Sequence, residues 1–191
     1  MTEILWSRLD TPGHDACRLI ETDVGWQLDG NAVFVHEGLP ARLAYSLACE
    51  RAWRTQRGDV SGWNGSEQIA LTITRSVAGV WTHNGAVVSG LDDCVDLDLG
   101  FTPATNLSQI RRLGLAEGQG ADATVAWLDV TSGALRLLGQ WYERRSESTY
   151  WYEAPQFNYT GLLEVSPAGF VRRYPGLWEV DEASDPPPDA P

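Results

Sequence analysis

The sequence contains no lysine and little cysteine, histidine or methionine. All fourteen fixed cationic side chains among its 191 residues are therefore arginines, and the formal net charge is −12. Nucleic acids and anionic membrane surfaces attract proteins with net positive charge, so we expect neither as a partner. The three cysteines and three histidines show no spacing typical of metal ligands, and we predict no metal, no other cofactor and no disulfide framework.

Long apolar runs are also missing. No segment approaches the roughly 18 apolar residues needed to span a bilayer, and the first ten residues lack a basic region followed by an apolar one. We therefore expect a soluble, cytoplasmic protein with no integral membrane association. Residues 1–180 are predicted to form a single β domain. Residues 181–191 are acidic and rich in proline, and we expect them to be disordered.

Most of the chain shows short apolar alternation bounded by turn residues, which is typical of half-buried strands. Asn84-Gly85 favours a tight hairpin between strands at 80–82 and 86–88, and residues 25–35 are predicted to form a second, hairpin-like pair around Asp29-Gly30. Further strands are expected at residues 43–54, 69–74, 123–130, 134–144, 148–153, 159–165 and 169–174. Because most connections are short, we predict that the strands form an antiparallel sheet.

One short helix is predicted near residues 103–113. Thr102 offers a capping hydroxyl, Pro103 suits the first helical position and Gly114 is typical of a helix end. A helix of this length is marginal on its own in water. We therefore expect its apolar face to pack against the sheet.

The stretch around this helix is the densest in special residues. Asp96 and Asp98 lie two residues apart, hence on one face of a strand, and paired carboxylates can act as acid and base in glycoside hydrolysis. The structural alternative is that Arg111 and Arg112, carried back by the helix, form ion pairs with these carboxylates. In that case Arg111→Ala should impair folding, since it would leave a buried carboxylate unpaired.

Nine tryptophans and six tyrosines are many for a chain of this length. Groups such as residues 141–142 and 150–152 alternate faces along a strand, so each group supplies rings to both faces. Rings that face a groove can line an acyl chain or stack on a sugar, with their polar atoms holding a headgroup. Rings that pack across strands simply stabilise the sheet. Both interpretations stay open here.

Residues 91–113, which read LDDCVDLDLGFTPATNLSQIRRL, resemble the signature block of a bacterial family of glycolipid-binding proteins. The flanks agree, at residues 45–54, 80–81, 126–128, 140–142, 150–152 and 169–178, so that the resemblance covers roughly residues 15–180. It implies a strongly curved antiparallel sheet around an apolar groove, similar to the open barrel of bacterial lipoprotein carriers. Ser108-Gln109 departs from the more apolar, proline-containing step of that family.

These observations predict a mainly β protein. We expect one strongly curved antiparallel sheet that forms an open or incomplete barrel, with one short helix near residues 103–113. The favoured function is binding of an amphiphilic small molecule, a glycolipid or fatty acyl ligand, whose chains lie in an apolar groove. The alternatives are a carbohydrate- or glycolipid-modifying enzyme that uses Asp96 and Asp98, and a protein-interaction module. The candidate ligand-binding residues are Trp53, Trp81, Asp96, Asp98, Thr105, Asn106, Arg111, Arg112, Trp141, Tyr142, Trp151, Tyr152, Arg173 and Tyr174.

Overall fold

The apolar alternation becomes one sheet of fifteen strands in the computed structural model, which describes residues 1–181. Its helical elements are α1 (Asn106–Leu113) and the short 3-10 turn η1 (Pro155–Phe157). The strands are β1 (Thr2–Arg8), β2 (Gly13–Glu21), β3 (Gly25–His36), β4 (Leu39–Glu50), β5 (Thr55–Asn64), β6 (Glu67–Arg75), β7 (Trp81–His83), β8 (Ala86–Val88), β9 (Asp96–Leu99), β10 (Gly120–Asp129), β11 (Ala134–Arg144), β12 (Thr149–Ala154), β13 (Tyr159–Val165), β14 (Val171–Tyr174) and β15 (Trp178–Val180). The acidic tail predicted at 181–191 lies, except for its first residue, outside the described residues.

The strand order is β8-β7-β6-β5-β4-β3-β2-β1-β15-β14-β13-β12-β11-β10-β9. All neighbours within residues 1–181 are antiparallel except β9 and β10, which run parallel. The predicted antiparallel sheet is therefore correct but for this pair. The exception arises because the segment between β9 and β10 contains α1 and is long enough to return the chain to the start of a parallel neighbour.

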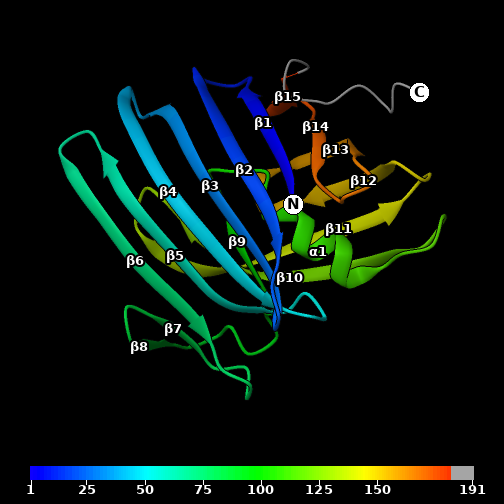
Figure 1. Cartoon of the computed structure of the whole chain (residues 1–191), viewed down its shortest axis with the longest axis horizontal. Helices are drawn as coiled ribbons and strands as arrows, with labels where there is room; N and C mark the ends of the chain where they lie inside the picture. Colours follow the sequence, from blue (N-terminus) through cyan, green and yellow to red (C-terminus); the bar gives the residue numbers. More distant parts are fainter. Residues whose placement is uncertain (182–191) are drawn as a thin grey trace.

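The sheet is open and strongly curved, as the sequence predicted. Its edge strands β8 and β9 do not pair with each other, yet the curvature brings β9 beside the start of β5. There the Thr55 N–H donates to the Val95 carbonyl at 3.2 Å, and the Leu97 N–H donates to the Thr55 hydroxyl at 2.9 Å. Figure 1 shows β2–β6 as one wall and β10–β13 as the other, with α1 between them.

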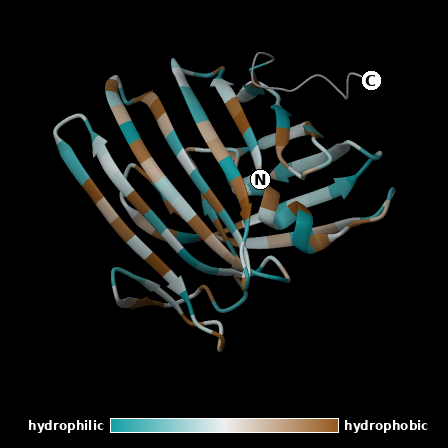
Figure 2. Cartoon of the chain, viewed as in Figure 1, coloured by the Kyte–Doolittle hydropathy of each residue, from teal (hydrophilic) through white to brown (hydrophobic). Residues whose placement is uncertain are grey.

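Side chains alternate between buried and partly exposed along the long strands, and Figure 2 shows this as bands of opposite hydropathy. The buried apolar residues form two clusters. The larger is built mainly on β1–β7 and the smaller on β10–β14. Helix α1 joins them, because Leu107 is buried in the larger cluster and Ile110 in the smaller. Burial on two sides therefore stabilises a helix too short to persist alone. No helix of the described residues is long and apolar enough to cross a membrane.

The helix begins three residues later than predicted. Residues before Asn106 form tight turns instead, in which the Asn106 N–H donates to the Pro103 carbonyl at 3.3 Å. The Thr102 hydroxyl accepts from the Ala104 N–H at 3.0 Å, so it caps this turn rather than the helix. The end is as predicted, since Gly114 adopts a left-handed φ of 54°.

The predicted hairpin at Asp29-Gly30 is wrong. β3 runs straight through both residues, and its register with β4 places Gly30 opposite Tyr45. A Cβ atom at Gly30 would overlap the ring of Tyr45. The glycine is therefore needed for close packing of an aromatic ring across the strand, which local sequence does not distinguish from a turn.

Gly30→Ala should therefore destabilise the fold by about 1–3 kcal/mol, the usual cost of overpacking a core. Gly139→Ala in β11 is the matched control, because a Cβ atom there meets nothing within 4 Å. Urea unfolding of both variants measures the difference. Equal stability of the two would show that the Tyr45 ring can move aside without cost.

Candidate functional site

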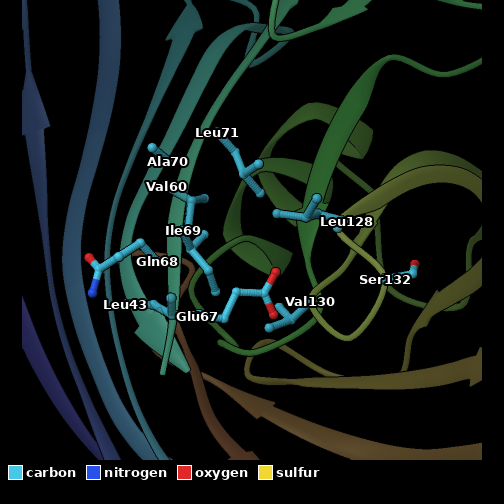
Figure 3. A pocket seen from close by; sticks show the side chains of 11 residues that line it. Leu43, Val60, Glu67, Gln68, Ile69, Ala70, Leu71, Leu128, Val130 and Ser132 are labelled. Carbon is cyan, nitrogen blue, oxygen red and sulfur yellow. The ribbon is translucent and has the colours of Figure 1, made fainter. Parts of the chain in front are cut away.

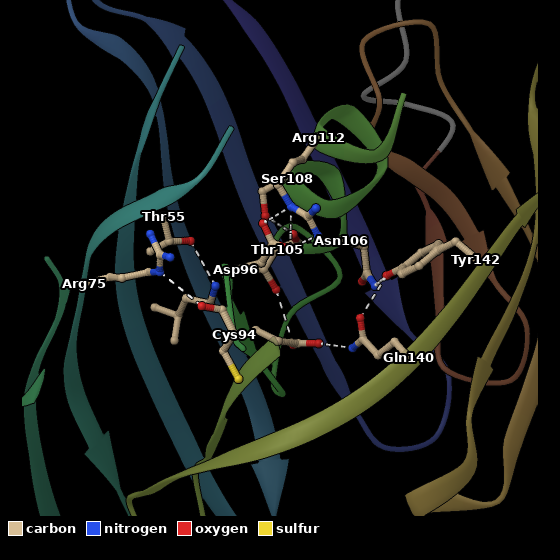
Figure 4. Close-up of polar contacts among 12 residues, drawn as sticks. Thr55, Arg75, Cys94, Asp96, Thr105, Asn106, Ser108, Arg112, Gln140 and Tyr142 are labelled. Atoms are coloured by element: carbon tan, nitrogen blue, oxygen red, sulfur yellow. Dashed lines mark hydrogen bonds and ion pairs between the residues drawn. The ribbon is translucent and has the colours of Figure 1, made fainter. Parts of the chain in front are cut away.

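Buried polar side chains concentrate in one short segment. Ten polar or charged side chains are buried within residues 1–181, and seven of them belong to residues 96–109: Asp96, Asp98, Thr102, Thr105, Asn106, Ser108 and Gln109. The other three, Asp15, Thr55 and Gln140, each form a hydrogen bond with this segment. We refer to these residues as the buried polar network, except for Gln109, whose buried side-chain amide has no hydrogen-bond partner within residues 1–181. It lies where the two walls of the sheet meet α1 (Figure 4).

The carboxylate of Asp96 is fully buried and is held by Arg112. The Arg112 guanidinium donates from Nε to both carboxylate oxygens at 2.9–3.0 Å and from Nη2 to Oδ2 at 2.6 Å. Burial raises the pKa of Asp96, and the neighbouring Arg112 opposes that shift. The sequence-predicted ion pair between β9 and the helix is therefore present for this aspartate.

Within residues 1–181, Asp98 has no cationic partner and accepts hydrogen bonds from neutral donors. Gln140 Nε2 donates to Asp98 Oδ2 at 2.5 Å, and the Thr105 hydroxyl donates to Oδ1 at 3.4 Å. The network continues from the Gln140 Oε1, which accepts from the Tyr142 hydroxyl at 3.3 Å, and Asn106 Nδ2 donates to that hydroxyl oxygen at 2.7 Å. Burial raises the pKa of Asp98 to about 6, despite the donors from Gln140 and Thr105.

Asp15, on β2, fixes the other end of the segment. Its Oδ2 accepts hydrogen bonds from the Thr102 hydroxyl and, at 2.9 Å, from the Tyr45 hydroxyl. Burial raises the pKa of Asp15 to about 6, although these hydroxyl donors lower it in part. Asp15 on β2 and Asp98 on β9 therefore hold the same turn, one through Thr102 and the other through Thr105.

This geometry favours a structural role for the paired carboxylates. A glycoside hydrolase needs both carboxyl groups at an open cleft. Asp96 is 0% exposed and Asp98 is 8% exposed, and both are engaged by protein donors. A substrate would therefore not reach the two carboxyl groups, as glycoside hydrolysis requires.

Arg111 does not pair with either aspartate, contrary to the sequence prediction. It is exposed, and it donates from Nε to the Ala168 carbonyl at 2.9 Å and from Nη2 to the Pro167 carbonyl at 3.0 Å. Successive helical residues point about 100° apart, so only one of the two arginines can face β9. The folding defect that the sequence predicted for Arg111→Ala is therefore expected for Arg112→Ala instead.

The remaining candidates on β11–β14 divide between the inside and the outside of the sheet. Tyr142 and Tyr152 are buried with ring centroids 4.9 Å apart, and the half-buried Tyr174 lies 5.5 Å from Tyr152. Trp141 and Trp151 lie half-buried on neighbouring strands, at register positions that alternate with these tyrosines. Cross-strand packing accounts for these contacts.

The other candidates are farther from the segment or on the surface. Trp53 holds a left-handed φ of 66° and stacks on Trp26 at 4.6 Å, while Trp81 is buried and donates to the Cys94 carbonyl at 3.1 Å. Arg173 is exposed and lies within 4.0 Å of two glutamates. The structure therefore brings together Asp96, Asp98, Thr105, Asn106, Arg112 and Tyr142, but not the outer tryptophans or Arg173. Their role in ligand binding stays a prediction.

An apolar groove of about 150 Å³ lies between the two walls near the open rim (Figure 3). One wall comes from β4–β6 and the other from β10 with the turn that follows it. The lining residues are Leu43, Val60, Glu67, Gln68, Ile69, Ala70, Leu71, Leu128, Val130, Ser132 and Gly133. None of the fourteen sequence candidates lines this groove. The alternation at residues 69–74 was visible in the sequence, but nothing local indicated that Leu128 and Val130 would face it.

The fold and these sites define a class: a curved, open sheet whose interior is filled by a polar helical segment and which keeps an apolar groove at its rim. The chain matches, over residues 3–180, the model of the family described as "Putative glycolipid-binding". It therefore belongs to this family. Among solved structures, it is similar to a DUF1089 family protein from Pseudomonas aeruginosa, with 28% identity and a TM-score of 0.77 over 86% of this chain and 91% of that one. No curated protein matches it.

Arg112→Ala should lower the free energy of unfolding by about 3–5 kcal/mol, because it leaves the buried Asp96 carboxylate without its cation. Arg111→Ala removes an exposed arginine bonded only to carbonyls and should cost less than about 1 kcal/mol. Denaturant unfolding of the two neighbouring variants provides the comparison. Similar losses would contradict the assignment of the ion pair to Arg112.

Asp98 should also make stability depend on pH. The folded protein retains the Asp98 proton up to about pH 6, whereas the unfolded chain releases it near the ordinary value of 3.8. Folding therefore takes up a proton between pH 4 and 6, and stability falls as pH rises through this window, by up to about 3 kcal/mol for this group. Asp98→Asn should remove that part of the slope. Parallel stability curves for wild type and variant between pH 4 and 7 would refute this.

Proposed function

We propose that this protein binds an amphiphile of the glycolipid type, with part of its acyl chain in the apolar groove between β6 and β10. The observation that carries the proposal is the arrangement of the groove walls. Val60, Leu71 and Leu128 form its apolar part, while Glu67 and Ser132 are polar residues in its lining. An apolar wall with a few polar groups is what a ligand with a chain and a polar head requires. Membership of the glycolipid-binding family supports the same ligand class.

The size of the groove limits what it holds. Ligand pockets for drug-sized molecules occupy roughly 300–1,000 Å³, so a groove of about 150 Å³ accommodates a segment of one chain rather than a whole lipid. About five buried methylene groups would contribute about 4 kcal/mol before the cost of association, which alone corresponds to about millimolar binding. Headgroup contacts at the rim must therefore supply part of the affinity.

The groove takes its lining from both walls of the sheet. Leu43 and Leu71 come from the first wall, whereas Leu128 and Val130 come from the second. A ligand held there would touch residues that are almost ninety positions apart in the chain. We therefore propose that residues 1–180 work as one β domain in which neither half binds alone.

Leu71→Trp should fill the groove and weaken binding of an alkyl glycoside about tenfold or more, because the half-buried Leu71 side chain points into it. Leu162→Trp is the matched control, since Leu162 is 44% exposed on β13 and does not line the groove. Isothermal titration calorimetry with octyl glucoside, together with native mass spectrometry, measures both. Unchanged binding by a folded Leu71→Trp variant would exclude this groove as the acyl site.

A further inference from the structure

Two polar side chains lie side by side next to the turn of the β5–β6 hairpin. The strand register pairs Asn64 with Glu67 and, four residues farther from the turn on each strand, Val60 with Leu71. Residues two or four apart on a strand share a face, so Asn64 and Glu67 lie on the face that carries the apolar wall. Figure 3 shows the Glu67 side chain extending across the groove towards Val130. The wall therefore changes from apolar to polar at its rim.

The two side chains have acceptor oxygens without protein donors. Within residues 1–181, Asn64 Oδ1 is buried without a hydrogen-bond partner, but Asn64 does not line the groove. Glu67 does line it, is exposed, and its carboxylate forms no hydrogen bond or ion pair within residues 1–181. The Glu67 carboxylate is therefore the acceptor of this hairpin that a ligand in the groove would meet.

The opposite wall offers an acceptor as well. The Ser132 hydroxyl donates its proton to Asp129 Oδ2 at 2.6 Å, and its oxygen accepts from the Ala134 N–H at 3.3 Å. Because the Ser132 hydroxyl proton is used in the hydrogen bond to Asp129, the hydroxyl can act towards a ligand only as an acceptor. Gln68, although it belongs to the lining, points away from the groove in Figure 3 and does not change this pattern.

The charges near the rim also favour a ligand that donates hydrogen bonds over an anionic one. Glu67 lines the groove, and the Asp129 carboxylate lies directly behind Ser132. Two cationic or titratable groups lie near this rim: Arg136 interacts electrostatically with Asp129, and the His36 ring is hydrogen-bonded to Thr131 at 3.0 Å. Neither lines the groove. An anionic headgroup would therefore meet carboxylates before it met a cation.

We propose that the rim selects an amphiphile with an uncharged, hydroxyl-rich headgroup against one with a carboxylate, and that Glu67 determines this specificity. This inference rests on the proposed function, because it concerns the headgroup of the ligand whose chain occupies the groove. Sugar hydroxyls can donate hydrogen bonds to the acceptors of Glu67 and Ser132. A carboxylate has no proton to donate at neutral pH, and Glu67 repels it.

Titration of octyl glucoside and of octanoate, both below their micelle-forming concentrations and at pH 8, compares two heads on matched chains. The wild type should bind the glucoside about tenfold more tightly than octanoate. Glu67→Gln removes the charge but keeps an acceptor, and it should strengthen octanoate binding about tenfold while changing glucoside binding little. Ser61→Ala, at an exposed position of β5 that does not line the groove, is the control and should leave both affinities unchanged.

The outcomes separate this inference from the proposed function. If octanoate binds wild type as tightly as the glucoside, or if Glu67→Gln leaves their ratio unchanged, the headgroup assignment is overturned. The groove would still stand in that case, provided that Leu71→Trp abolishes binding of both compounds. If neither compound binds the wild type, the proposed function fails and the headgroup inference fails with it. Melting temperatures verify that the variants at these rim positions fold.

Discussion

The structure depends on the burial of a polar segment, residues 96–109, between two apolar walls. Leaving a buried carboxylate or hydroxyl without a partner costs more free energy than most apolar contacts supply, so this segment fits only where matching groups from both walls reach it. Asp15 reaches Thr102 from β2, and Gln140 reaches Asp98 from β11. The network therefore fixes the relative position of the walls, which apolar packing alone would specify less sharply.

Two consequences follow for the rest of the molecule. With α1 and β9 inside the curve, the centre of the sheet is filled by protein. The apolar groove between the walls is therefore small, about 150 Å³, and lies near the rim rather than at the centre. The buried aspartates, whose pKa values burial raises, link the stability of this arrangement to pH.

The sequence correctly predicted a tight turn and the end of the helix, which depend on the backbone preferences of a few neighbouring residues. Asn84 and Gly85 adopt the left-handed φ values of 48° and 81° that a tight hairpin needs, and Gly114 ends the helix as expected. Of the ion pairs predicted between the two arginines and the two aspartates, only Arg112–Asp96 forms, and the sequence could not say which arginine faces β9. Gly30 was wrongly predicted to lie in a turn. In the sequence, a glycine that makes room for an aromatic ring on the next strand cannot be distinguished from a glycine in a turn. The groove could not be predicted from the sequence, because its walls come together only through the curvature of the whole sheet. Its lining contains none of the fourteen residues that the sequence suggested as ligand-binding candidates.

A crystal structure of the protein with octyl glucoside would show whether the walls held by the buried polar network leave a groove for an amphiphile. We expect the alkyl chain to lie between Leu71 and Leu128, the sugar to lie at the rim beside Glu67, and residues 96–109 to keep their contacts. A chain bound on another surface, or a groove closed by its own side chains while ligand binds elsewhere, would contradict this expectation.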